Sequence, residues 1–279
     1  MANQWQRLLR NQGTWVGSFT QLDPLGTILQ DTPSQVSLLP LQGGELMRQE
    51  IRLTTAGESP RETVLEYRSL GRGVLFCENG AFSQGAIQWS PVSEFGAELG
   101  LREGSDRLRL VLLFPRQPHL GSLTLIREHQ QGTTPLQRRP LTLDQLVGTW
   151  AGQAVTVYPD WQPEKSCSTR LVIKRQGTDR LLQSLYLDGG QVIESQARVE
   201  GSILAFDQGC QPVNVLLLPD GASATFPRSI QPGQPFFLEA GWLVTPTLRH
   251  RLVRHYNAQG TWISLTLVIE EKLAEFPEG

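Results

Sequence analysis

An all-β fold of two tandem antiparallel barrels, each preceded by a short helix, is predicted by three features of the sequence. Gly-Thr-Trp occurs at residues 13–15 and again at residues 148–150, each time after a short amphipathic run. Matching strand-like segments then follow in the same order in both halves of the chain. The 27 glycines and 18 prolines favour many turns and short strands over long helices. Closure into barrels would also remove the exposed edges of antiparallel sheets.

The matching segments indicate an internal duplication. "RLRLVLLF" at residues 107–114 aligns with "RHRLVRHY" at residues 249–256, with Arg, Arg, Leu and Val in register. "SLTLI" aligns with "SLTLV", and an Asn-Gly turn pair aligns with an Asp-Gly pair, both of which favour β-hairpins. Because these matches keep one order and a nearly constant separation, we expect two homologous domains.

The boundary between the two domains is expected near Pro140. The segment from His129 to Gln145 is polar and contains prolines, as is typical of a linker. We therefore assign residues 1–139 to the first barrel and residues 140–279 to the second. Helical spacing is confined to the runs before each Gly-Thr-Trp, and the rest of each half is expected to form about eight to ten short strands.

A short helix followed by Gly-x-Trp at the start of the first strand resembles the lipocalin and wider calycin pattern. In that family the tryptophan closes the floor of the barrel beneath an arginine from near the end of the last strand. The resemblance implies that Trp15 and Trp150 are structural residues of two barrel floors. It also implies that Arg127 lies over Trp15, whereas Lys272 is the nearest cation for the second floor.

The whole chain is similar to a cyanobacterial family of two-domain lipocalin-like proteins of unknown function. The segments "ENGAFSQG", "SEFGAELGL" and "QPFFLEAGWL" contribute to this similarity. The resemblance implies the fold and the group of organisms, and it implies no activity.

Composition and motifs argue against several classes of function. The formal net charge is −2 and the basic residues are dispersed, so nucleic-acid binding is not expected. The three cysteines lie far apart and near no histidine at metal-ligand spacing, which argues against a metal site. No nucleophile elbow or phosphate-binding loop is present, so an enzyme is not favoured; an activity, if there is one, is expected to be bilin attachment of the lyase type. No stretch is apolar enough to span a membrane, and a cytoplasmic protein is expected.

One late strand of the second domain contains the most informative polar side chains. The equivalent strand of the first domain has a wholly apolar face, alternate residues from 108 to 114, which we expect to point inward. By register, Arg254 and Tyr256 then point into the second barrel, and this Arg-x-Tyr pair resembles the carboxylate-binding pair of fatty-acid-binding proteins. A buried guanidinium needs a partner. Arg254 is therefore expected to meet either an anionic ligand, with Glu239 as a second contact, or an internal carboxylate.

Four further side chains are candidates for ligand contact, and each has a structural alternative. Trp89 and Trp242 are either cavity walls or ordinary core residues. Glu98 occupies the position equivalent to Glu239, so a buried acid is expected to recur in both barrels. Arg68 either lines the first cavity or lies on a solvated strand face.

These features favour a non-enzymatic protein that binds a small hydrophobic or amphipathic ligand in a barrel cavity. Candidate ligands are a bilin, a carotenoid or other isoprenoid, and a fatty acid. The second domain is the expected site, because the apolar face of residues 108–114 predicts a filled first barrel. One alternative is a lyase-like chaperone that presents a bilin to a phycobiliprotein or another photosynthetic protein, by resemblance to the single-barrel phycobiliprotein lyases. The other is a scaffold or assembly protein with filled barrels.

Overall fold

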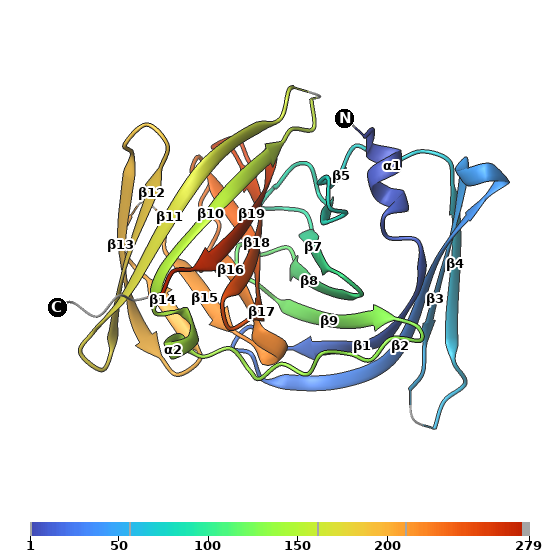
Figure 1. The fold of residues 1–279 in the computed structure, drawn as a ribbon, viewed down its shortest axis with the longest axis horizontal. Helices are drawn as coiled ribbons and strands as arrows, with labels where there is room; N and C mark the ends of the chain where they lie inside the picture. The colour runs from blue at the N-terminus through green and yellow to red at the C-terminus, as the bar shows by residue number, and fades with distance from the viewer. Residues whose placement is uncertain (1, 56, 161, 210, 275–279) are drawn as a thin grey trace.

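The computed structural model describes residues 2–55, 57–160, 162–209 and 211–274, and they form an almost entirely β structure. Figure 1 shows two curved antiparallel sheets side by side, the first from the N-terminal half and the second from the C-terminal half. Helix α1 (Gln4–Leu9) precedes the first sheet and helix α2 (Leu143–Leu146) precedes the second. The predicted fold class, all-β with a short helix before each unit, is confirmed.

The first sheet contains nine antiparallel strands and remains open. Its spatial order is β4 (Arg61–Tyr67), β3 (Leu46–Leu53), β2 (Ile28–Leu41), β1 (Gly13–Leu22), β9 (Ser122–Gln130), β8 (Asp106–Phe114), β7 (Phe95–Glu103), β6 (Phe82–Gly85) and β5 (Val74–Phe76). The two outer strands, β4 and β5, do not pair with each other. This unit is therefore a half-barrel, where the sequence predicts a closed one.

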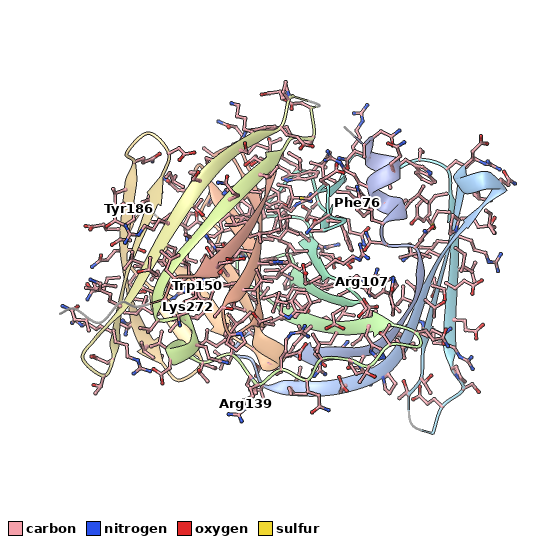
Figure 2. The ribbon with its side chains drawn as sticks, viewed as in Figure 1. Phe76, Arg107, Arg139, Trp150, Tyr186 and Lys272 are labelled. Carbon is pink, nitrogen blue, oxygen red and sulfur yellow. The ribbon has the colours of Figure 1, made fainter. Side chains whose placement is uncertain are left out.

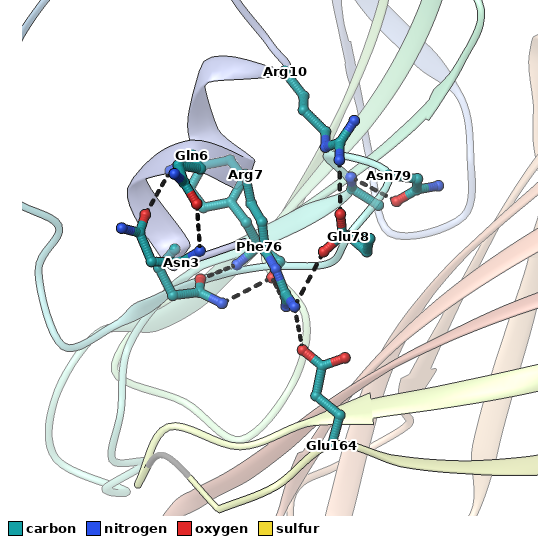
Figure 3. A network of polar contacts seen from close by, with 10 residues as sticks. Asn3, Gln6, Arg7, Arg10, Phe76, Glu78, Asn79 and Glu164 are labelled. Atoms are coloured by element: carbon teal, nitrogen blue, oxygen red, sulfur yellow. Dashed lines mark hydrogen bonds and ion pairs between the residues drawn. The ribbon is translucent and has the colours of Figure 1, made fainter. Parts of the chain in front are cut away.

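Helix α1 occupies the edge of β5 at which the first sheet would have closed. The side-chain amide of Gln4 donates a hydrogen bond to Phe76 O (3.0 Å), and its oxygen accepts one from Phe76 N (2.7 Å). Arg7 Nη1 donates to the same carbonyl oxygen (3.1 Å), as Figure 3 shows. The backbone groups of Phe76 are satisfied by the helix, and β4 cannot pair with them.

The second sheet closes into a ten-stranded barrel whose consecutive strands pair throughout. The strands are β10 (Gly148–Val157), β11 (Lys165–Gln176), β12 (Arg180–Leu187), β13 (Val192–Glu200), β14 (Ile203–Phe206), β15 (Val213–Leu217), β16 (Ala222–Pro227), β17 (Phe236–Thr245), β18 (Leu248–Tyr256) and β19 (Trp262–Lys272). Strand β19 pairs with β10 and completes the barrel. This unit is the closed antiparallel barrel that the sequence predicts, with up-and-down topology.

Each Gly-Thr-Trp segment anchors the start of its first strand to the turn before it. The two glycines have φ angles of +114° and +126°, which residues with a side chain rarely adopt. Both indoles are fully buried, and each donates a 2.9 Å hydrogen bond to a carbonyl four residues earlier, from Trp15 to Asn11 and from Trp150 to Leu146. The repeated sequence therefore corresponds to a repeated local structure.

The two units lie against each other, as Figure 1 shows. Apolar side chains of both sheets form one cluster between them. Alternate residues of β8 from 108 to 114 are at most 1% exposed, and they share one hydrophobic cluster with residues of β17 and β18. In this cluster the Phe236 ring stacks on Tyr256 with a centroid distance of 4.6 Å, and Phe95 meets Tyr256 edge-on at 5.1 Å. Burial of each large apolar side chain here stabilises the folded protein by about 1.5–3 kcal/mol relative to its exposure to water. The halves share one core, and we expect them to unfold together.

One face of β8 and the equivalent face of β18 point in the direction opposite to the predicted one, because both lie at this interface. The sequence predicts that the apolar face of β8 points into the first barrel, but it lies outside that unit, against the second one. Arg254 and Tyr256, on the equivalent face of β18, also lie at the interface. Alternation determines which residues share a face, but not which face is the inner one. In this protein both faces of these strands carry buried side chains, although Leu113 of β8 is exposed, so burial alone does not distinguish the faces.

A buried arginine of α1 adds a polar contact between the units. Arg7 forms an ion pair with Glu78 of the first half (3.3 Å) and another with Glu164, which precedes β11 in the second half. Figure 3 shows these two carboxylates meeting the same guanidinium. The N-terminal helix thus contacts both sheets.

Candidate functional site

The closed barrel encloses a cavity of about 540 Å³. Most of the area of its wall is apolar, with aliphatic side chains from β11, β12, β14 and β15. They include Leu171, Ile173, Leu181, Leu204 and Val215. The cavity is therefore an apolar space within the second unit, where the sequence predicts one.

Four charged side chains gather beside this cavity. Arg249 and Arg251 of β18 and Glu239 of β17 line it, and Glu270 of β19 lies behind the two arginines. Glu270 is 3.2 and 3.3 Å from Nε and Nη2 of Arg251, and 3.3 Å from Nη1 of Arg249. Glu239 is 3.4 Å from Nη1 of Arg251. Two guanidinium groups and two carboxylates balance each other in charge.

The Nη1 atom of Arg249 has no hydrogen-bond acceptor among the residues that the structure describes, although the side chain is buried. Its contact with Glu270 is an ion pair without hydrogen-bond geometry. Burial lowers the pKa of Arg249, and the neighbouring Glu270 opposes this shift. On the same face of β18, burial lowers the pKa of His255 to about 4, so its ring is neutral at pH 7. The cluster therefore retains one unused charged donor.

The first sheet has two arginines and two glutamates at the equivalent positions, and these four side chains are in closer contact with one another. Glu128 accepts hydrogen bonds from Arg107 Nε (2.8 Å) and from Arg109 Nε and Nη2 (2.9 and 2.8 Å). Arg109 Nη1 donates to Glu98 (2.6 Å). Burial raises the pKa of Glu128, but the two arginines outweigh it and hold this pKa at about 2. The adjoining cavity is smaller, at about 310 Å³.

A cation lies over each buried tryptophan, and in the first unit it is not the predicted one. Arg107 lies over the Trp15 ring, 4.3 Å from its centroid, whereas Arg127 bonds to hydroxyl groups of β1. In the second unit the Lys272 ammonium is 5.4 Å from the centroid of Trp150, and Figure 2 shows the two residues side by side. The basic residue over the first floor therefore comes from β8 rather than from the last strand.

A glycine makes room for the buried glutamate in each unit. Gly17 faces Glu128 and Gly152 faces Glu270 across a strand pair. A Cβ atom at either glycine would overlap the backbone of the facing strand. Both halves therefore need a glycine two residues after the tryptophan.

Comparisons with known proteins agree with this duplicated structure. Residues 1–133 match the family model "Domain of unknown function (DUF3598), N-terminal". Residues 137–273 match "Biogenesis factor required for ATP synthase 1, C-terminal domain". A crystal structure of a DUF3598-family protein of unknown function from Nostoc punctiforme is 48% identical, with a TM-score of 0.91, and the alignment covers 98% of this chain and 100% of that one. The chain belongs to the DUF3598 family.

More distant structures resemble only part of this DUF3598 chain or resemble it weakly. The S-type phycobiliprotein lyase CPES from Guillardia theta is 14% identical, with a TM-score of 0.39, over 48% of this chain and 92% of that one. At this level the likeness carries no functional argument. No curated protein matches the chain.

In the DUF3598 chain, Arg254 and Tyr256 lie outside the barrel cavity, which corrects their predicted inward direction. Arg254 is fully buried at the interface, where it donates to Tyr256 Oη (2.7 Å), Ser83 Oγ (3.0 Å) and Ala86 O (3.1 Å). Its guanidinium carbon lies 3.5 Å from the centroid of the Trp262 ring. Its partners are neutral acceptors and an aromatic face, so the predicted carboxylate or anionic ligand is not what surrounds it.

The other predicted site residues lie in four different places. Glu239 lines the second cavity and Glu98 the first, and each contacts an arginine. Trp89 and Trp242 belong to the core between the two units and line neither barrel cavity. Arg68 is exposed and donates a hydrogen bond to an exposed glutamine. Of the predicted ligand contacts in the second domain, Glu239 alone faces its cavity.

Three residues that form the charged end of the cavity are not among those predicted from the sequence: Arg249, Arg251 and Glu270. A signal for them was present. Both arginines align with arginines in the first half, and a glutamate stands three residues after "SLTL" in both halves. Charged residues that recur in both copies of a duplicated strand indicate buried partners. Because Arg254 and Tyr256 are expected to point into the barrel, the opposite face of the same strand, which bears Arg249 and Arg251, is expected to point outward.

The described residues show no arrangement typical of a metal site or a membrane helix. Within residues 2–55, 57–160, 162–209 and 211–274, no three His, Cys, Asp or Glu side chains gather so that they could hold a metal ion. None of the helices in that part of the chain has the length and apolar character of a membrane span.

Proposed function

We propose that this DUF3598 protein binds one small, largely apolar molecule inside its closed barrel. The observation that carries the proposal is the cavity of about 540 Å³, whose apolar walls meet a buried charged cluster with an unused donor at Arg249 Nη1. Pockets for small molecules typically enclose about 300–1,000 Å³, with mostly apolar walls and a few polar groups that orient the ligand. A scaffold with filled barrels would need no such space.

Three classes of ligand suit these walls: a bilin, an isoprenoid and a fatty acid. Each has an apolar body for the aliphatic side chains and a polar end for the cluster around Arg249. A lyase-like role, in which the barrel presents a bilin to a phycobiliprotein, is a narrower form of the same proposal. Binding of a bilin in strong preference to the other two classes would favour it.

Filling the cavity is expected to abolish binding. Ala154 on β10 faces the cavity and is buried, so Ala154→Phe places a phenyl ring in the ligand's space. Gln153 is exposed on the opposite face of the same strand, and Gln153→Phe adds the same ring outside the barrel. We expect wild-type and Gln153→Phe protein to bind at least one of biliverdin, retinol and dodecanoic acid with micromolar affinity, and Ala154→Phe protein to bind none. Native mass spectrometry and fluorescence titration measure this.

Circular dichroism verifies that both variants fold before the titrations are compared. Equal binding of a probe by the Ala154→Phe and wild-type proteins would mean that the probe binds elsewhere. Failure of the wild-type protein to bind any of the three probes would contradict the proposal.

A second function is favoured by a separate observation, the match of residues 137–273 to a domain of a biogenesis factor required for ATP synthase. By analogy, we propose as the alternative that the second half of this chain assists the assembly of ATP synthase. Disruption of the gene, followed by measurement of assembled ATP synthase on native gels, tests it. A loss that is restored equally by wild-type and Ala154→Phe protein would support assembly without a ligand, and an unchanged amount would contradict it.

A further inference from the structure

We infer that the ligand of the closed barrel has an uncharged polar end, a hydroxyl or carbonyl group, and that this group accepts a hydrogen bond from Arg249 Nη1. The inference rests on the proposed function and narrows its ligand class. Within that class it favours isoprenoid or fatty alcohols, aldehydes, ketones and amides over molecules that bind through a free carboxylate.

The charges around the polar end of the cavity already balance. Arg249 and Arg251 are paired with Glu239 and Glu270, and no further acidic or basic side chain except His255 lines the cavity in the described part of the chain. The His255 ring is neutral at pH 7. A ligand carboxylate would therefore bring one unbalanced negative charge into a desolvated site, which is costly. An uncharged group leaves the balance intact.

The unused hydrogen-bonding capacity of the cluster fits such a group. Arg249 Nη1 is buried and has no acceptor among the described residues, so a ligand oxygen there satisfies it. Glu239 is held by one long contact of 3.4 Å with Arg251, and its carboxylate therefore has room to accept a hydrogen bond from a ligand hydroxyl. A ligand hydroxyl can accept a hydrogen bond from Arg249 or donate one to Glu239, and a ligand carbonyl can accept one from Arg249.

The equivalent cluster in the first sheet has the same four side chain types in closer contact with one another, although Arg107 Nη2 is also buried there without an acceptor among the described residues. There the arginine–glutamate hydrogen bonds are 2.6–2.9 Å long, and the Arg107 guanidinium also stacks on Trp15. In the second barrel the corresponding contacts are 3.2–3.4 Å long, and Arg249 stacks on no ring within the described residues. The cluster with the longer contacts, in the second barrel, adjoins the larger of the two cavities. This is the arrangement expected if the cluster binds part of a ligand.

Two series of ligands that differ only in the polar end test the inference. Retinol, retinal and retinoic acid share one isoprenoid body, and dodecanol, dodecanamide and dodecanoic acid share one alkyl chain. Each series is titrated into the wild-type protein at a pH slightly above neutrality, where the acids are ionised in water. In any series that binds, we expect the best uncharged member to bind at least about tenfold more tightly than the acid.

An arginine variant then tests the contact itself. Arg249→Met keeps much of the length of the side chain and removes its donors, and we expect it to weaken binding of the uncharged ligand by about tenfold or more. Arg170 is exposed on the same barrel, and Arg170→Met is expected to leave binding unchanged. The comparison of polar ends uses wild-type protein, so it does not depend on whether the variant folds.

The outcomes separate this inference from the proposed function. Equal or tighter binding of the acids would overturn the inference and leave the proposed function in place. Unchanged binding by the folded Arg249→Met variant would overturn the assigned contact. Failure of both whole series to bind would overturn the inference, and failure of biliverdin to bind as well would overturn the proposed function.

Discussion

Replacing Glu128 by glutamine is expected to lower the free energy of unfolding by about 3–5 kcal/mol, because it removes the carboxylate from a buried ion-pair cluster. The Glu128 side chain is fully buried and accepts three hydrogen bonds, one from Arg107 and two from Arg109. The uncharged amide would leave both buried guanidinium groups without their main counter-charge. Urea denaturation, with linear extrapolation to water, measures the change.

An exposed glutamate of the same sheet provides the control. Glu62 lies on the open edge strand β4 and pairs loosely with Arg52, at 3.5 Å, with both side chains more than half exposed. Glu62→Gln is expected to change the free energy of unfolding by less than about 0.5 kcal/mol. Effects of equal size at the two positions would contradict the importance of the buried cluster.

The same cluster makes stability depend on pH in the acid range. The pKa of Glu128 falls from its ordinary value of 4.5 to about 2 in the folded protein, since Arg107 and Arg109 outweigh the effect of burial. A lowered pKa contributes stability that is complete above about pH 4.5 and is lost as the pH falls towards 2. The stability difference between the wild-type and Glu128→Gln proteins should therefore shrink across this interval. A difference that stays constant would contradict the assigned pKa.

Replacing Trp150 by alanine is expected to lower the free energy of unfolding by about 3–5 kcal/mol, the usual range for a buried aromatic residue. The indole is fully buried, donates to Leu146 O and lies beneath Lys272, so its loss leaves a cavity and an unpaired carbonyl. Trp150→Phe retains most of the volume of the buried side chain, so we expect it to lower the free energy of unfolding by less than Trp150→Ala does. Urea denaturation of the two variants measures both changes.

Tyr186 provides an aromatic control on the outside of the same barrel. Its side chain is 41% exposed, and Figure 2 places it on the side of the barrel away from the first sheet. Tyr186→Ala is expected to change the free energy of unfolding by less than about 1 kcal/mol. If Trp150→Ala were no more destabilising than Tyr186→Ala, the tryptophan would not close the floor of the barrel.

The parts of the fold that the sequence predicts are those that local chemistry determines. The repeated Gly-Thr-Trp places a positive-φ glycine and a buried indole at the start of β1 and β10. Strand alternation also groups the residues of β8 and β18 correctly into two faces. These features depend on neighbours in the sequence, and a single chain contains enough information to find them.

The direction of those faces depends on contacts between distant segments. The apolar face of β8 meets β17 and β18 across the interface, and nothing within β8 distinguishes this core from a barrel interior. Arg254 was therefore expected in the ligand cavity, although its hydrogen bonds reach across the interface to β6 and to the segment that follows it. The open edge of the first sheet has a similar origin, because Gln4 binds a strand 72 residues away. The site residue Arg249 was missed for the same reason.

Native mass spectrometry of the protein purified from the organism that produces it tests the central claim most directly. Wild-type, Gln153→Phe and Ala154→Phe proteins are purified in parallel. We expect one additional small molecule per chain in the wild-type and Gln153→Phe proteins, and none in the Ala154→Phe protein. A bare polypeptide mass for the wild-type protein, with no uptake of added biliverdin, retinol or dodecanoic acid, would contradict the assignment of a ligand to the closed barrel.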